Sequence, residues 1–61
     1  MTIKELAQNW IENDRTGDYY NREITIEEAS DFVSMIDPEV VEETNATPEA
    51  FMEAWNSIVR G

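Results

Sequence analysis

Apolar residues recur every three to four positions along most of this chain, and no other feature of the sequence constrains the fold as strongly. The first stripe consists of Ile3, Leu6, Ala7, Trp10 and Ile11. The last stripe consists of Phe51, Ala54, Trp55, Ile58 and Val59. A middle stripe consists of Ile26, Ala29, Val33 and Ile36, widened by Phe32 and Met35. Because this spacing places each stripe on one side of a helix, it predicts an all-α fold, a small three- to four-helix bundle.

A threonine precedes each of the three stripes and predicts where each helix begins. Thr2 with Glu5, and Thr25 with Glu28, have the spacing of a capping box, in which each side chain binds a free backbone N–H of the first turn. Thr47 is followed by proline, which suits the first helical position because its missing N–H would have had no partner there.

Pro38 predicts the end of the middle helix, since the residue before a proline is driven out of helical geometry. Asp37 and Pro38 can in turn begin a short helix that buries Val40 and Val41. The expected helices cover about 2–13, 25–36, 38–44 and 47–60, with a polar loop at 14–24, in a single domain. The stripes direct four large aromatic side chains toward the core, namely Trp10, Phe32, Phe51 and Trp55.

The absence of cysteine and histidine narrows the chemistry of this 61-residue chain. Disulfides and the usual zinc sites are excluded, and the serines have no histidine to serve as a base. A chain of this length buries only about 60% of the surface that its unfolded form exposes, so it has little volume for a desolvated catalytic cleft. We therefore expect no enzymatic activity and no cofactor.

The net charge of −10 predicts the kind of partner. Such a chain is repelled by phosphate backbones and by anionic lipid head groups, so neither direct nucleic-acid binding nor membrane binding is expected. The sequence has no apolar stretch near the ~20 residues that a bilayer span requires and no secretory signal at residues 1–10. A cytoplasmic location is the resulting expectation.

Residues 14–28 resemble a calcium-binding EF-hand loop. Asp14, Thr16 and Asp18 would stand at the first, third and fifth ligand positions, and Glu28 would supply the closing carboxylate only in a longer loop. The pattern departs from the family at Tyr19, where a glycine is usual, and at Thr25, where a glutamate is usual. The alternative interpretation is a turn at residues 17–18 followed by the Thr25 cap.

Acidic residues one helical turn apart, with few bases to pair with them, predict an acidic binding surface. The candidate residues are Glu27, Asp31, Glu39, Glu42, Glu43, Glu49 and Glu53. Carboxylates spaced about 6 Å apart along a helix can imitate a run of phosphates and occupy a groove that normally holds nucleic acid. In composition the chain resembles small phage-encoded inhibitors of restriction or CRISPR nucleases. This implies a non-catalytic protein that modulates or inhibits a basic partner, for which a nucleic-acid-binding protein is the candidate.

Two other hypotheses are open. In the first, the exposed carboxylates keep the protein soluble and have no binding role. Alternatively, the chain is a protein-interaction or homodimerising module that docks by an apolar patch containing Met35, Met52, Tyr19 or Tyr20, because methionine and tyrosine favour such surfaces.

Overall fold

The chain folds as four helices, seen in a computed structural model that describes residues 1–13 and 22–61. The helices are α1 (Ile3–Asn13), α2 (Ile26–Met35), α3 (Pro38–Thr44) and α4 (Pro48–Arg60). No strand is found within these two described segments. The predicted small all-α bundle is therefore confirmed.

Threonine caps begin α1, α2 and α4. In the Thr25 capping box, the Thr25 hydroxyl accepts from the Glu28 N–H at 3.2 Å, and the Glu28 carboxylate accepts from the Thr25 N–H at 2.9 Å. Thr2 and Glu5 make the same two bonds at 3.1 and 2.9 Å. The Thr47 hydroxyl accepts from the N–H of Ala50 at 3.1 Å. These bonds satisfy first-turn N–H groups that have no partner inside the helix.

A tight corner separates α2 from α3. Ile36 and Asp37 are extended, as expected before Pro38, and the Asp37 carboxylate caps α3 by accepting from the Glu39 N–H at 2.9 Å. At the other end of α3, Asn45 adopts the left-handed conformation (φ 54°), which asparagine tolerates better than most residues. The short helix is thus fixed at both ends by local chemistry.

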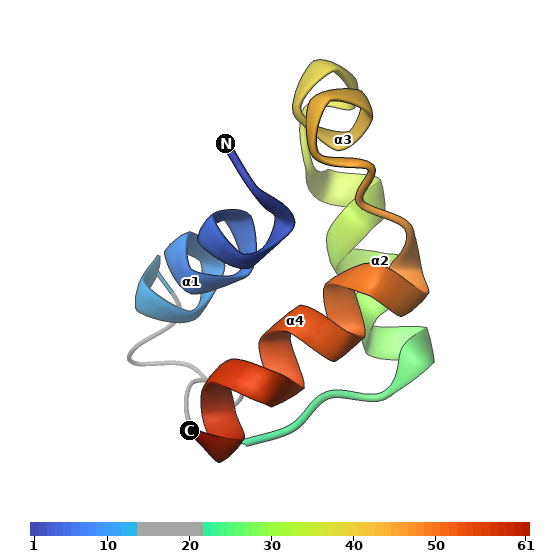
Figure 1. Cartoon of the computed structure of the whole chain (residues 1–61). Helices are drawn as coiled ribbons and strands as arrows, with labels where there is room; N and C mark the ends of the chain where they lie inside the picture. The colour runs from blue at the N-terminus through green and yellow to red at the C-terminus, as the bar shows by residue number, and fades with distance from the viewer. Residues whose placement is uncertain (14–21) are drawn as a thin grey trace.

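Helix α4 is the central element of the fold. It packs against both α1 and α2 (Figure 1). Helices α1 and α2 meet each other through the rings of Trp10 and Phe32. Trp55 and Phe51 of α4 are fully buried, as are the small residues Ala7 of α1 and Ala29 of α2. Alanine at these sites lets the helix backbones approach closely, so the bundle closes around the aromatic rings of α4.

Four aromatic side chains join the three longer helices. Phe32 lies between Trp10 and Trp55, with ring centroids 5.4 Å from each. Phe51 completes the cluster at 6.0 to 6.3 Å from the other three rings. Such pairs contribute about 0.5–1.5 kcal/mol each beyond the area they bury. All four rings point into the bundle as the stripes predict, although Trp10 and Phe32 remain partly exposed.

Two side chains of α4 hold the extended segment that precedes α2. The Asn56 amide bonds both backbone groups of Ile24: its oxygen accepts from the Ile24 N–H at 2.7 Å, and its nitrogen donates to the Ile24 carbonyl at 3.1 Å. The Trp55 indole N–H donates to the Arg22 carbonyl at 3.0 Å. Ile24 is consequently buried, within a stretch expected to be a polar loop.

Candidate functional site

The candidate carboxylates of α2 lie on its solvent side. Glu27 and Asp31 are both exposed and stand one turn apart, on the face opposite the buried Ala29. No described basic group lies within 4 Å of either carboxylate. The pair therefore presents two uncompensated negative charges to solvent.

The three candidates of α3 are also exposed, but one of them is paired. Glu43 accepts from the Met1 amine at 3.1 Å, in an ion pair whose two side chains are 61% and 38% exposed. Such solvent-exposed pairs contribute little to stability. Glu39 and Glu42 form no ion pair with the described residues.

Glu49 and Glu53 repeat this arrangement on α4. Both are exposed and one turn apart, away from the buried Phe51 and Trp55. The single base of this helix, Arg60, is directed elsewhere: its Nε donates to the Asn56 carbonyl at 3.1 Å and lies 3.9 Å from Glu23.

The seven carboxylates come from three different helices, α2, α3 and α4. Helices α2 and α4 pack on each other, and the pairs Glu27/Asp31 and Glu49/Glu53 lie on the exposed sides of these two helices. The α3 group lies at the end where α2 and α4 are connected. The structure therefore divides the predicted acidic surface into three patches, one on each helix.

The arginines within the described segments pair with carboxylates outside these patches. Arg22 binds Glu28 at 2.9 Å, and Arg60 approaches Glu23. Six of the seven candidate carboxylates thus have no ion-pair partner among residues 1–13 and 22–61. These two arginines therefore do not neutralise the carboxylates of the acidic patches.

Two carboxyl groups outside the patches are held in their ionised form. The pKa of Glu28 is lowered chiefly by the hydrogen bond from the Thr25 backbone, and further by the hydrogen bond from Arg22. The pKa of Glu5 is lowered by the corresponding bond from the Thr2 backbone. Both shifts follow from capping, because an N–H donor stabilises the carboxylate more than the neutral acid.

The proposed calcium ligands fall largely outside the described residues. Asp14, Thr16 and Asp18 lie within residues 14–21, which the structure does not describe. The same is true of Tyr19 and Tyr20 of the apolar-patch hypothesis. Glu28 is engaged by Thr25 and Arg22, and no group of three acidic side chains converges within the described residues. The calcium hypothesis stays a prediction.

The two methionines of the apolar-patch hypothesis differ in exposure. Met35, the last residue of α2, is 64% exposed, whereas Met52 packs partly against the core. Of these two methionines, Met35 presents more of its side chain to a partner.

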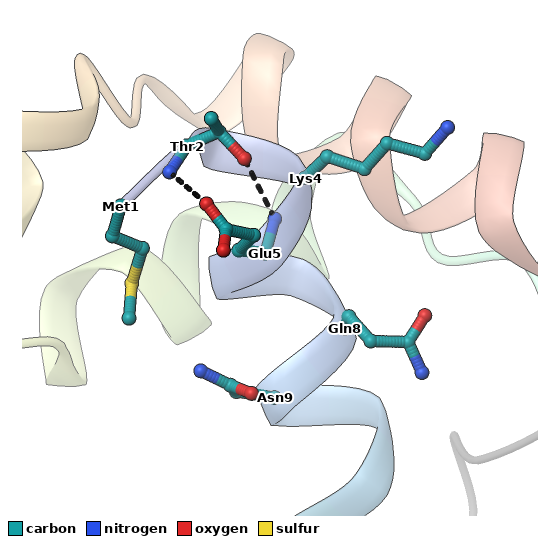
Figure 2. A pocket seen from close by; sticks show the side chains of 6 residues that line it. All are labelled: Met1, Thr2, Lys4, Glu5, Gln8 and Asn9. Carbon is teal, nitrogen blue, oxygen red and sulfur yellow. Dashed lines mark hydrogen bonds between the residues drawn. The ribbon is translucent and has the colours of Figure 1, made fainter.

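A shallow groove of about 350 Å³ runs along the first turns of α1. Thr2 and Glu5 bond each other there, while Lys4 and Gln8 extend to one side and Met1 and Asn9 to the other (Figure 2). The polar atoms do not converge on one point, and no nucleophile with an adjacent base is present in this groove.

A second cleft, of about 190 Å³, opens where α1, α2 and α4 meet. Trp10 and Asn13 line it from α1, Phe32 from α2 and Trp55 from α4. Sequence patterns assigned the three aromatic residues to the core and did not single out Asn13. The available signal was its position three residues after Trp10, on the same side of α1.

None of the helices in the described segments is long and apolar enough to cross a bilayer. No protein family model matches the chain, and neither characterised proteins nor solved structures include one that is significantly similar to it.

Proposed function

We propose that this chain is a non-catalytic binding protein whose acidic patches engage a basic surface on another protein. The observation that carries this proposal is that six exposed candidate carboxylates have no ion-pair partner among the described residues. Like-charge neighbours at i, i+4 cost a helix roughly 0.2–0.5 kcal/mol per pair. A basic partner would remove that repulsion on binding.

The chemistry of the patches favours a partner that itself binds nucleic acid. Two carboxylates one turn apart stand about 6 Å from each other, which is similar to the spacing of phosphates along a strand. A protein surface lined with Arg and Lys for phosphates would accept these helices instead. Binding by the chain would then compete with the nucleic acid.

The test is a charge reversal on α2, measured against a control with the same net charge. The variant carries Glu27→Lys and Asp31→Lys, and the control carries Glu12→Lys and Glu23→Lys, which are exposed acids outside the patches. Among the described residues, the control disturbs a 3.9 Å surface contact between Glu23 and Arg60 and a 3.4 Å hydrogen bond from the Gln8 amide to Glu12. Both proteins have a net charge of −6, because each gains four units over −10.

We expect the α2 variant to lose at least about ten-fold in affinity for the purified partner while its helicity is unchanged. The control should lose much less. Binding of the unmodified chain should weaken steeply with salt and should be competed by duplex DNA. Equal losses in the two variants would show that only net charge matters, and unchanged affinity in the α2 variant would refute the site.

A docking module with an apolar patch is the second candidate, favoured by the exposure of Met35. It predicts association that is insensitive to salt and weakened by Met35→Ser. Sedimentation at two salt concentrations separates it from the first candidate.

A further inference from the structure

The solvent side of α2 carries a row of side chains in which two acids are followed by an apolar residue. Glu27, Asp31 and Met35 follow one another at four-residue intervals, so they lie on the same side of the helix, about 6 Å apart. All three are exposed, and Met35, at 64%, is the most exposed large apolar side chain of the described residues. Neither carboxylate has an ion-pair partner among these residues. Helix α2 thus presents two unpaired charges and an apolar side chain in line.

Two small side chains border this row. Ser30 and Ser34 lie three residues after Glu27 and Asp31, and both serines are exposed. The Ser34 hydroxyl donates to the Asp31 carbonyl at 2.7 Å, so a partner can cover this hydroxyl without breaking its bond. The distance between packed helices depends on the side chains at the contact, and small side chains here allow another helix to approach α2 closely.

The acidic patches of α3 and α4 lack an apolar residue of this kind. The structure describes both helices in full, and neither has an exposed large apolar side chain. This difference matters because solvent-exposed ion pairs contribute little to binding, whereas burial of a methionine side chain adds affinity that salt does not screen. Of the three patches, the one on α2 is therefore the best suited to a stable contact.

We propose that the row Glu27, Asp31 and Met35 is the docking surface for a basic amphipathic helix of the partner, an inference that rests on the function proposed above. A helix repeats its side chains at the same interval as this row. Two of its lysines or arginines can therefore face the two carboxylates, while an apolar residue one turn further on covers Met35. The flexible methionine side chain adapts to irregular apolar surfaces. A second copy of this chain does not fit, because a symmetric contact through α2 brings the same carboxylates together.

The probes are alanine-based peptides of about seventeen residues, a length at which an isolated helix begins to form in water. The matched peptide carries two lysines and one leucine in a single row at four-residue intervals. In the rearranged peptide the leucine lies on the opposite side of the helix from the lysines. In the neutral peptide glutamines replace both lysines.

The methionine methyl groups, labelled with ¹³C, report on the contact. We expect the matched peptide to shift the Met35 signal saturably at low salt and to leave Met52, which packs against the core, nearly unmoved. The rearranged and neutral peptides should bind about three-fold or more weakly. No saturable shift, or equal binding of the rearranged peptide, would overturn the proposal. Equal binding of the neutral peptide would overturn it in favour of the apolar module, and a Met35 signal that shifts with the concentration of the chain alone would identify a second copy as the occupant.

Met35→Gln provides the second test, with Ile26→Gln as its matched control. Both are exposed apolar residues of α2, but they are nine residues, or about two and a half turns, apart and so lie on opposite sides of the helix. Met35→Gln should weaken binding of the matched peptide by about three-fold or more, followed through the backbone amides of α2, and Ile26→Gln should change it little. Equal effects in two variants of unchanged helicity would exclude Met35 as the apolar contact.

Paired neutral substitutions locate the charges. Glu27→Gln with Asp31→Asn should remove the preference for the matched peptide over the neutral one, whereas Glu49→Gln with Glu53→Gln should preserve it, although both variants lose two negative charges. A larger effect of the α4 pair would place the docking surface elsewhere. If the proposed function fails, partner binding shows neither salt dependence nor competition by duplex DNA. If only the α2 surface is wrong, those results stand and the difference between the matched and rearranged peptides is absent.

Discussion

Asn56 is the buried polar residue on which the path of the chain before α2 depends. Its amide satisfies both the N–H and the carbonyl of Ile24, as a neighbouring strand would. Asn56 is only 7% exposed, so water cannot easily replace these bonds. Burial of the Ile24 backbone thus depends on this side chain, while the Trp55 indole holds the same segment at Arg22.

Replacing Asn56 with leucine should therefore destabilise the fold severely. The substitution leaves two buried backbone groups of Ile24 without partners, at a cost of about 1–3 kcal/mol for each unsatisfied group. A bundle of this size has only about 3–5 kcal/mol of stability. Urea unfolding followed by tryptophan fluorescence measures the loss. The exposed neighbour Ser57, changed to alanine, should shift the midpoint little. A midpoint for Asn56→Leu equal to that of the control would show that the amide bonds are dispensable.

Sequence patterns predict much of the apolar core but not this polar residue, and they place Ile26, which is 42% exposed, in the middle stripe. Phe51 and Trp55 follow the helical spacing and are fully buried. Asn56 lies at the flank of the same stripe, where hydropathy assigns an amide to the surface. Its partner Ile24 lies in a stretch with no periodicity, so only the three-dimensional path of the chain brings the two together.

At the scale of the helix, the starting points were predictable because the signals are local. Each threonine cap and each proline acts within four residues of itself, so the expected boundaries of α1, α2 and α4 differ from the observed ones mainly by the capping residue. The three acidic patches could be predicted from the sequence only in part. Spacing along one helix predicted the pairs, but the relative orientation of helices depends on packing that the stripes do not specify.

The capping box of α2 should make stability depend on pH. Because the pKa of Glu28 is lowered in the folded chain, this carboxyl binds a proton more readily in the unfolded chain, and its contribution to stability rises with pH. The contribution is complete above the ordinary value of 4.5 and is lost as pH falls through the folded pKa. Glu28→Gln keeps an oxygen acceptor for the cap but cannot titrate there.

Urea midpoints measured between about pH 6 and pH 3 test this contribution. Glu28→Gln should rise less steeply with pH than the unmodified chain does. As a control, Glu27→Gln removes one negative charge from the preceding position of α2 without touching the cap. This variant should retain the Glu28 contribution. If both variants flatten the profile equally, the dependence arises from general charge and not from capping.

For the whole molecule, repulsion among carboxylates opposes folding. Fourteen acidic residues are opposed by four basic ones, and the exposed patches concentrate the excess on α2, α3 and α4. Bringing these charges into a bundle with a radius of gyration of 10.3 Å places many of them within one Debye length at moderate salt. Screening should then stabilise the folded chain.

We expect the melting temperature to rise as NaCl increases from about 10 mM to about 200 mM, over which the Debye length shortens from about 30 Å to below 10 Å. Relief of about 1 kcal/mol corresponds to roughly 4–8 °C for a domain of this size. Circular dichroism at 222 nm follows the transition. The variant with Glu27→Lys and Asp31→Lys should gain less, since it starts with less repulsion. A melting temperature that falls with salt would mean that attractive pairs dominate.

The central position of α4 also affects how the chain is made. During synthesis α1 and α2 are complete well before residues 51–56 join the chain, yet their buried faces close around Phe51 and Trp55 of that stretch. The segment before α2 likewise waits for Asn56. The growing polypeptide therefore carries unsatisfied apolar stripes until α4 is synthesised, and a nascent chain stalled before α4 would be a substrate for chaperones and proteases.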